Sequence, residues 1–110
     1  MDDDLPLALG QLQAEIDDQG RRITVRLRGD LDIATASQFR AVTAPLRDRD
    51  LTLDLSRLDL VDSSGLREIV RLRDDLQPDH ELSVVAVEGG LPWHLIALAK
   101  LAGVLRLHSA

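Results

Sequence analysis

The feature that most constrains the fold is a change of hydrophobic period within residues 51–76. Residues 51–56 alternate between leucine and polar residues, and this period of two is typical of a half-buried β-strand. After the stretch Asp-Ser-Ser-Gly, apolar residues recur at helical spacing from Leu66 to Leu76, and Pro78 ends the pattern. The segment therefore predicts a strand, a short loop and an amphipathic helix in direct succession.

Four other segments have the patterns of strands. Residues 12–17 and 21–29 alternate on either side of a turn at Gly20, which predicts an antiparallel hairpin. Residues 82–87 are nearly all apolar, and such a run is typical of a strand that is covered on both faces of a sheet. The last strand is predicted at residues 104–108.

Two further helices are predicted. Thr35 and Gln38 have the spacing of a capping box, in which the threonine side chain caps the helix, and Pro45 then predicts a kink or an early end. The other helix is predicted to begin near Pro92 and to end at Gly103. Its buried side is predicted to consist of Leu95, Leu98, Ala99 and Ala102. The resulting order, β-β-α-β-α-β-α-β, indicates an α/β fold with a mixed sheet, an opening hairpin and helices packed on the sheet.

Length and charge indicate how the chain is organised. A chain of 110 residues without internal repeats fits a single domain over residues 1–110. The formal net charge of −6 arises at the N-terminus, because residues 1–20 hold six acidic residues and no lysine or arginine. We expect residues 1–11 to form an acidic, frayed end.

Composition excludes several classes of function. The chain has no cysteine and its three histidines lack metal-ligand spacing, so we expect no metal and no cofactor. Glycine-rich phosphate loops are absent, as are the basic stripe and stacking aromatics of a nucleic-acid-binding protein. No apolar run is long enough to span a membrane. We therefore expect a cytoplasmic protein that contacts no nucleic acid directly and inserts into no membrane.

The Asp-Ser-Ser-Gly stretch at residues 62–65 has two interpretations. Asp and Ser are favoured at helix N-caps, so the stretch can serve only to begin the helix. It also places Ser64 near the carboxyl end of a strand, where open α/β sheets have their binding sites, and Gly65 lets a partner approach closely. The flanks lack the GxSxG pattern of a hydrolase nucleophile, so we expect no catalytic residue.

A phosphate on Ser64 would be tolerated by the predicted helix. It would lie beside free N–H groups and the positive end of the helix dipole. It would also add about −1.5 to −2 charges next to Asp62. The hydroxyl can therefore act as a binding switch that changes the shape of the domain little.

Three stretches of the sequence resemble the STAS domain family. "VRLRGDLDIATASQF" resembles the family's Gly-Asp/Glu-Leu-Asp turn and the helix start after it. "LTLDLSRLDLVDSSGLREIV" resembles the segment with the Asp-Ser-Ser-Gly-Leu signature, and "HLIALAKLAGVLRL" resembles the third helix and last strand. The resemblance covers about residues 12–107. A single short domain with this signature most resembles the bacterial anti-sigma-factor antagonists.

The resemblance implies a binding protein rather than an enzyme. Such an antagonist binds an anti-sigma factor that is also a serine kinase, and thereby releases a sigma factor for transcription. The kinase phosphorylates the second serine of the signature, here Ser64, the modified protein no longer binds, and a serine phosphatase reverses the change. The implied partner-binding residues are Asp30, Asp32, Asp62, Ser63, Ser64, Gly65 and Arg67. The family commonly adds a fourth helix after the last strand, whereas this sequence ends at Ala110.

Two groups of these residues also have simpler interpretations. The turn at residues 29–32 is predicted to end the second strand, so its two aspartates can either shape the turn or contact the partner. Arg67 and Arg71 lie one turn apart on the predicted helix. They can either belong to a solvated face, paired with Glu68 and Asp75, or contact an acidic partner.

Two other functions are compatible with the same resemblance. The first is a STAS subunit of an ABC-type lipid transporter, which would use the same face to bind an ATPase. The second is nucleotide binding by the domain itself, for which the sequence offers no phosphate loop.

Overall fold

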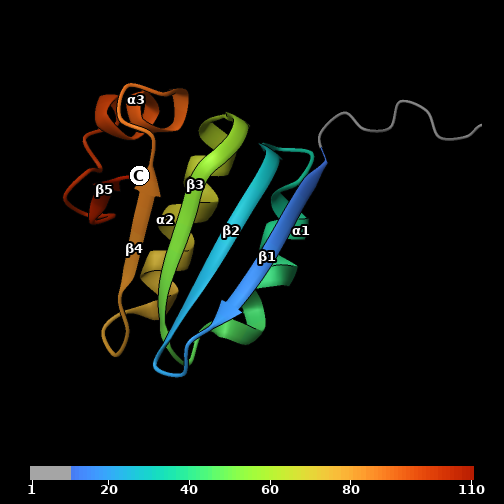
Figure 1. Ribbon diagram of the computed structural model, residues 1–110, viewed down its shortest axis with the longest axis vertical. Helices are drawn as coiled ribbons and strands as arrows, with labels where there is room; N and C mark the ends of the chain where they lie inside the picture. The colour runs from blue at the N-terminus through green and yellow to red at the C-terminus, as the bar shows by residue number, and fades with distance from the viewer. Residues whose placement is uncertain (1–10) are drawn as a thin grey trace, which may run out of the picture.

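The protein has a five-stranded sheet in the order β1-β2-β3-β4-β5, in which β1 is antiparallel to β2 and the other neighbours are parallel (Figure 1). The computed structural model describes residues 11–110, so the predicted frayed end lies, except for Gln11, outside the described residues. The strands are β1 (Leu12–Asp18), β2 (Arg22–Leu31), β3 (Asp50–Val61), β4 (Leu82–Ala86) and β5 (Leu107–Ser109). The helices are α1 (Ala36–Thr43), α2 (Ser63–Leu76) and α3 (Leu91–Leu98), with a 3-10 turn, η1 (Ala44–Leu46), after α1. The predicted element order and the opening hairpin are confirmed.

The core lies between the sheet and the helices on one of its faces. Helices α1 and α2 lie behind the sheet in Figure 1, and α3 lies beyond the end of β4. Alternate residues of β2 and β3 are buried against these helices, as their period of two predicts. Phe39 of α1 and Ile69 of α2 are buried in the same cluster.

The prediction that β4 is covered on both faces is wrong. Leu82, Val84 and Ala86 are buried, whereas Ser83 and Val85 on the other face are only half-buried. Nearly continuous apolar sequence does not require two covered faces, because much of a folded protein's accessible surface is apolar.

The opening hairpin is held at its turn by Asp18. The Gly20 N–H donates to the Asp18 carboxylate over 2.9 Å, and Arg49 donates to it over 2.8 Å. These two hydrogen bonds hold the pKa of the Asp18 carboxyl below its ordinary value. Gly20 has a φ of +87°, the left-handed conformation that its sequence position predicts.

Residues 29–32 do not end the second strand where predicted. Strand β2 continues through Asp30 to Leu31, and a shift in its register with β3 absorbs the irregularity. Gly29 takes a φ of +90° at this bulge. Helix α1 ends at Thr43 and passes into η1, which contains Pro45, so the early end predicted there is confirmed.

The C-terminal region differs most from the prediction. Helix α3 ends at Leu98, and the buried positions near it are Pro92, Ile96 and Leu105. Of the four residues predicted to be buried, Leu98 is 80% exposed, Ala99 and Ala102 are exposed, and Leu95 is half-buried. The chain leaves the helix through Lys100, which has a φ of 61°, rather than through Gly103. Strand β5 therefore begins only at Leu107.

Within residues 11–110, no helix combines the length and the apolar character needed to cross a membrane.

Candidate functional site

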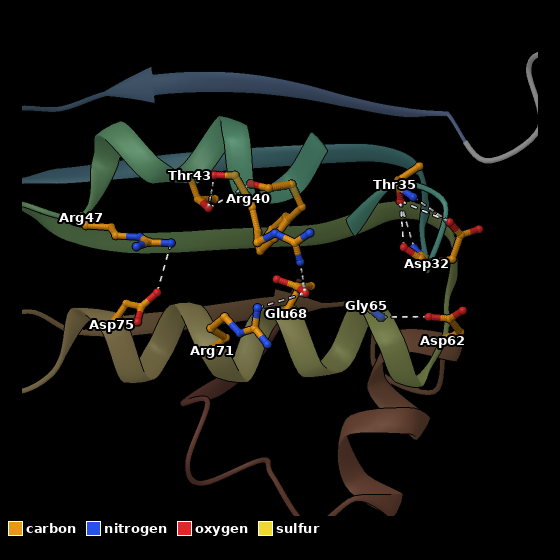
Figure 2. A network of polar contacts seen from close by, with 11 residues as sticks. Asp32, Thr35, Arg40, Thr43, Arg47, Asp62, Gly65, Glu68, Arg71 and Asp75 are labelled. Atoms are coloured by element: carbon orange, nitrogen blue, oxygen red, sulfur yellow. Dashed lines mark hydrogen bonds and ion pairs between the residues drawn. The ribbon is translucent and has the colours of Figure 1, made fainter. Parts of the chain in front are cut away.

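Two loops meet at the carboxyl ends of β2 and β3. Leu31 and Val61 are paired in the sheet, and the residues that follow them, Asp32 and Asp62, begin the connections to α1 and α2. Figure 2 shows both aspartates at the same end of the two helices. Carboxyl ends of parallel strands are the usual place for binding sites in open α/β sheets. The structure therefore brings together the two loops that the sequence singles out.

Asp62 begins α2 as an N-cap residue. Its side chain accepts a hydrogen bond from the Gly65 N–H over 2.8 Å, as expected for a cap. Its own N–H donates to the Leu31 carbonyl oxygen over 3.3 Å, which ties this loop to the end of β2. The N–H groups of Ser63 and Ser64 have no acceptor among residues 11–110. The N-terminus of α2 thus has free N–H donors and the positive end of the helix dipole beside the two serines.

The two serines differ in exposure. Ser63 is the first residue of α2 and is exposed, whereas Ser64 is the second and is half-buried. Gly65 follows them and is buried, because α2 begins in close contact with β2. A Cβ atom at residue 65 would overlap the carbonyl oxygen of Leu31. The missing side chain therefore makes room for Leu31 of the same chain, a role that sequence reasoning did not assign to this glycine.

The other loop is held by Thr35. Its buried hydroxyl donates to the Asp30 carbonyl oxygen over 2.9 Å and accepts from the Asp32 N–H over 3.0 Å. The Asp32 carboxylate accepts from the N–H groups of Ala34 and Thr35 over 3.0 and 3.2 Å. Thr35 is the N-cap residue of α1 but makes no side-chain cap bond, so the predicted capping box is wrong. The hydroxyl bonds backward to the loop, and the loop fixes where Asp32 lies.

Arg67 is exposed and has no ion-pair partner among the described residues. Arg71 lies 3.8 Å from Glu68, whereas Asp75 pairs with Arg47 of the segment after η1 over 3.1 Å. The predicted pairing of Arg71 with Asp75 is therefore wrong, because Arg47 reaches that carboxylate from the neighbouring segment. Arg67 is left available to solvent or to a partner.

Comparisons with known proteins identify the family and the fold of this chain. The family model described as "Mlab, STAS domain" matches residues 14–108. The chain belongs to the STAS domain family. Its fold is similar to that of an anti-sigma factor antagonist from Mycobacterium paratuberculosis, with a TM-score of 0.80, 21% identity, and coverage of 89% of this chain and 86% of that one.

A second similar structure is the anti-sigma factor antagonist SpoIIAA. Its unphosphorylated form has a TM-score of 0.69 and 19% identity, and the match covers 89% of this chain and 88% of that one. The phosphorylated form of the Bacillus protein has a TM-score of 0.65 and 17% identity, with 89% and 91% covered. At these identities the likeness establishes that the STAS domain shares their fold.

Sequence reasoning missed one polar cluster of the STAS domain, centred on Glu68. This residue was expected on the solvated face of α2, yet it is only 6% exposed. Its carboxylate lies 2.5 Å from Arg40 of α1 and faces Arg71 one turn further along α2 (Figure 2). The spacing of Glu68 from Gly65 and Leu72 places it on their side of the helix, and this spacing was the available signal. The ion pair ties together the helices that follow the two loops.

We predict that replacing Arg40 and replacing Glu68 lower the stability of the domain by different amounts. Arg40→Met is expected to lower the free energy of unfolding by about 2–3 kcal/mol, because it leaves a buried carboxylate without its nearest cation. Glu68→Gln is expected to cost less than about 1 kcal/mol, because the amide still accepts from Arg40 and no charge is left buried. Urea unfolding measures both values.

The control for this comparison is Arg73→Met. Arg73 pairs with the exposed Asp74 on the same helix, so its loss is expected to change stability by no more than about 0.5 kcal/mol. Equal costs for Arg40→Met and Glu68→Gln would contradict the importance of the buried charge.

Proposed function

We propose that this STAS domain is an anti-sigma-factor antagonist that acts by binding and is not an enzyme. Its unphosphorylated form binds an anti-sigma factor that is also a serine kinase, and this releases a sigma factor. Phosphorylation of Ser64 blocks the binding, and a serine phosphatase restores it. Membership of the STAS family and the shared fold with anti-sigma factor antagonists support this role.

The observation that carries the proposal is the position of Ser64. It is the second residue of α2, half-buried, two residues after the Asp62 cap, and it lies at the carboxyl ends of β2 and β3 together with the Asp32 loop. A phosphate there would meet the free N–H groups of the first helical turn, so the fold tolerates it. The same phosphate would place about −1.5 to −2 charges beside Asp62, and a docking surface complementary to a neutral hydroxyl would reject that charge.

The remaining residues of the proposed site have distinct roles. Asp30 and Asp32 shape the neighbouring loop through their bonds with Thr35, and the Asp32 loop forms one border of the surface. Gly65 lets α2 lie close to Leu31, so that Ser63 and Ser64 stay near the carboxyl ends of β2 and β3. Arg67 is exposed one turn after Ser64 and offers a cation to an acidic group on the partner. We propose that these residues belong to the partner-binding site, Gly65 by positioning the serines and the others on its surface.

The proposal is tested by incubating the protein and ATP with an anti-sigma factor kinase that binds it. Mass spectrometry is expected to find the phosphate on Ser64, and a Ser64→Ala variant is expected to remain unmodified while still binding the kinase. Phosphate found only on other residues would contradict the site assignment. Binding of a transporter ATPase, unaffected by phosphorylation, would instead favour the ABC-type lipid transporter subunit.

A further inference from the structure

The face of the sheet opposite α1 and α2 is open and polar. Parallel strands are usually covered on both faces, yet among the described residues no helix covers this side of β2 and β3. The side chains there include Thr24, Arg26 and Arg28 of β2, together with Thr52, Asp54 and Arg57 of β3. This face lies away from the core, and no part of the proposed switch requires its charges.

Two arginines are paired directly on this open face. Arg28 and Arg57 occupy partnered positions of β2 and β3, and both are exposed. Like charges placed opposite each other in a sheet are unfavourable. Neither arginine has a carboxylate within ion-pair distance among residues 11–110, whereas the neighbouring Arg26 pairs with Asp17 over 3.4 Å. The fold thus keeps two uncompensated guanidinium groups side by side.

A hollow lies between these side chains. It has a volume of about 280 Å³ and is lined by residues of β1, β2 and β3, namely Gln13, Ala14, Glu15, Arg26, Arg28 and Arg57. Three guanidinium groups and one carboxylate line it. Arg26 is already paired with Asp17, so Arg28 and Arg57 face only the Glu15 carboxylate, which leaves an excess of one positive charge in a chain whose formal net charge is −6. The adjoining hollow of about 300 Å³ includes Asp30 and Asp59 and is therefore less suited to an anion.

We propose that the first hollow binds the phosphate group of a phosphomonoester. Guanidinium groups present planar pairs of N–H donors that match phosphate oxygens, and two of them approaching from neighbouring strands balance a doubly charged anion. The Gln13 amide supplies a further donor at the wall formed by β1. None of the described residues that line the hollow is aromatic, and Ala14 is its one apolar residue, so recognition is confined to the phosphate. This site is separate from Ser64 and does not depend on the proposed switch.

The test is a nuclear magnetic resonance titration with inorganic phosphate at pH 7.5, compared with sodium chloride at matched ionic strength. Phosphate is expected to shift the backbone amides of Gln13, Arg28 and Arg57. AMP is expected to bind within about threefold of inorganic phosphate, because no aromatic side chain is present to stack on its base. If AMP binds much more tightly than inorganic phosphate, the site also recognises the base or the sugar, and the proposal that it recognises only the phosphate is wrong.

Two variants are compared. The first is the double variant with Arg28→Gln and Arg57→Gln, and the second, the control, carries Arg106→Gln. The double variant is expected to bind phosphate about 100-fold more weakly, because it loses two charge-assisted contacts and each contributes roughly a factor of ten. Its circular dichroism spectrum and melting temperature are expected to match or exceed those of the wild type, since a repulsive pair has been removed. Arg106 pairs with Glu81 elsewhere on the protein, and its loss is expected to leave phosphate binding unchanged. Shifts centred on Ser63 and Ser64, or equal shifts with chloride, would overturn the proposal.

Discussion

Ser64→Asp is expected to weaken binding of the anti-sigma factor by about 100-fold, or about 2.7 kcal/mol, while the domain remains folded. The loss follows from placing an unpaired charge beside Asp62 in a surface that the partner must desolvate. The fold is expected to persist because Ser64 is the second residue of α2, where a negative charge interacts favourably with the helix dipole. Isothermal titration calorimetry measures the affinity, and thermal unfolding measures the stability.

Ser37→Asp is the matched control for this substitution. Ser37 is exposed, whereas Ser64 is half-buried, but like Ser64 it is the second residue of its helix, α1, so the added charge has the same relation to a helix dipole. It is expected to leave the affinity within about threefold of the wild-type value, because the residue lies outside the proposed surface. Equal losses from both substitutions would show that net charge, rather than the place of the charge, controls binding, and the switch at Ser64 would be refuted.

The sequence predicted those parts of the fold that depend on local periodicity. The change from period two to helical spacing within residues 51–76 correctly located α2 and the first half of β3, because each pattern buries one face of its element. Strand β3 continues to Val61, five residues past the predicted strand. The Asp62 cap was also predictable, because the Gly65 N–H that it binds is only three residues away in the sequence. The structure of the C-terminal region was not predictable in this way, because the end of α3 depends on how Leu105 packs into a core formed by distant strands.

The polar contacts of the site were less predictable than the elements that carry them. Thr35 has the sequence signature of a cap, yet its hydroxyl bonds to the Asp30 carbonyl because β2 continues farther than the pattern indicates. Glu68 has the charge of a surface residue, but its cation lies on α1, 28 positions earlier in the chain. Such pairs arise from the packing of one helix against another, which a local pattern does not encode.

The contact between Gly65 and Leu31 gives the largest expected effect on stability. Gly65→Ala is expected to lower the free energy of unfolding by about 2–3 kcal/mol, because the added Cβ overlaps the Leu31 carbonyl oxygen and α2 must move away from β2. Helix propensity alone predicts the opposite sign, since alanine in a helix is favoured over glycine by about 0.5–1 kcal/mol. The sign of the change, measured by urea unfolding, therefore decides between these two effects.

Gly103→Ala is the control for that measurement. Gly103 has open space where a Cβ would lie, so this variant is expected to stay within about 0.5 kcal/mol of the wild type. A shift of α2 in Gly65→Ala would also stretch the hydrogen bond from the Asp62 N–H to Leu31, which holds the serine loop against the end of β2. We therefore expect phosphorylation of Ser64 to slow in Gly65→Ala under conditions in which both variants are fully folded, and to be unchanged in Gly103→Ala. A Gly65→Ala protein that is as stable as the wild type would mean that Leu31 yields without cost, and that close contact is not the reason for glycine at this position.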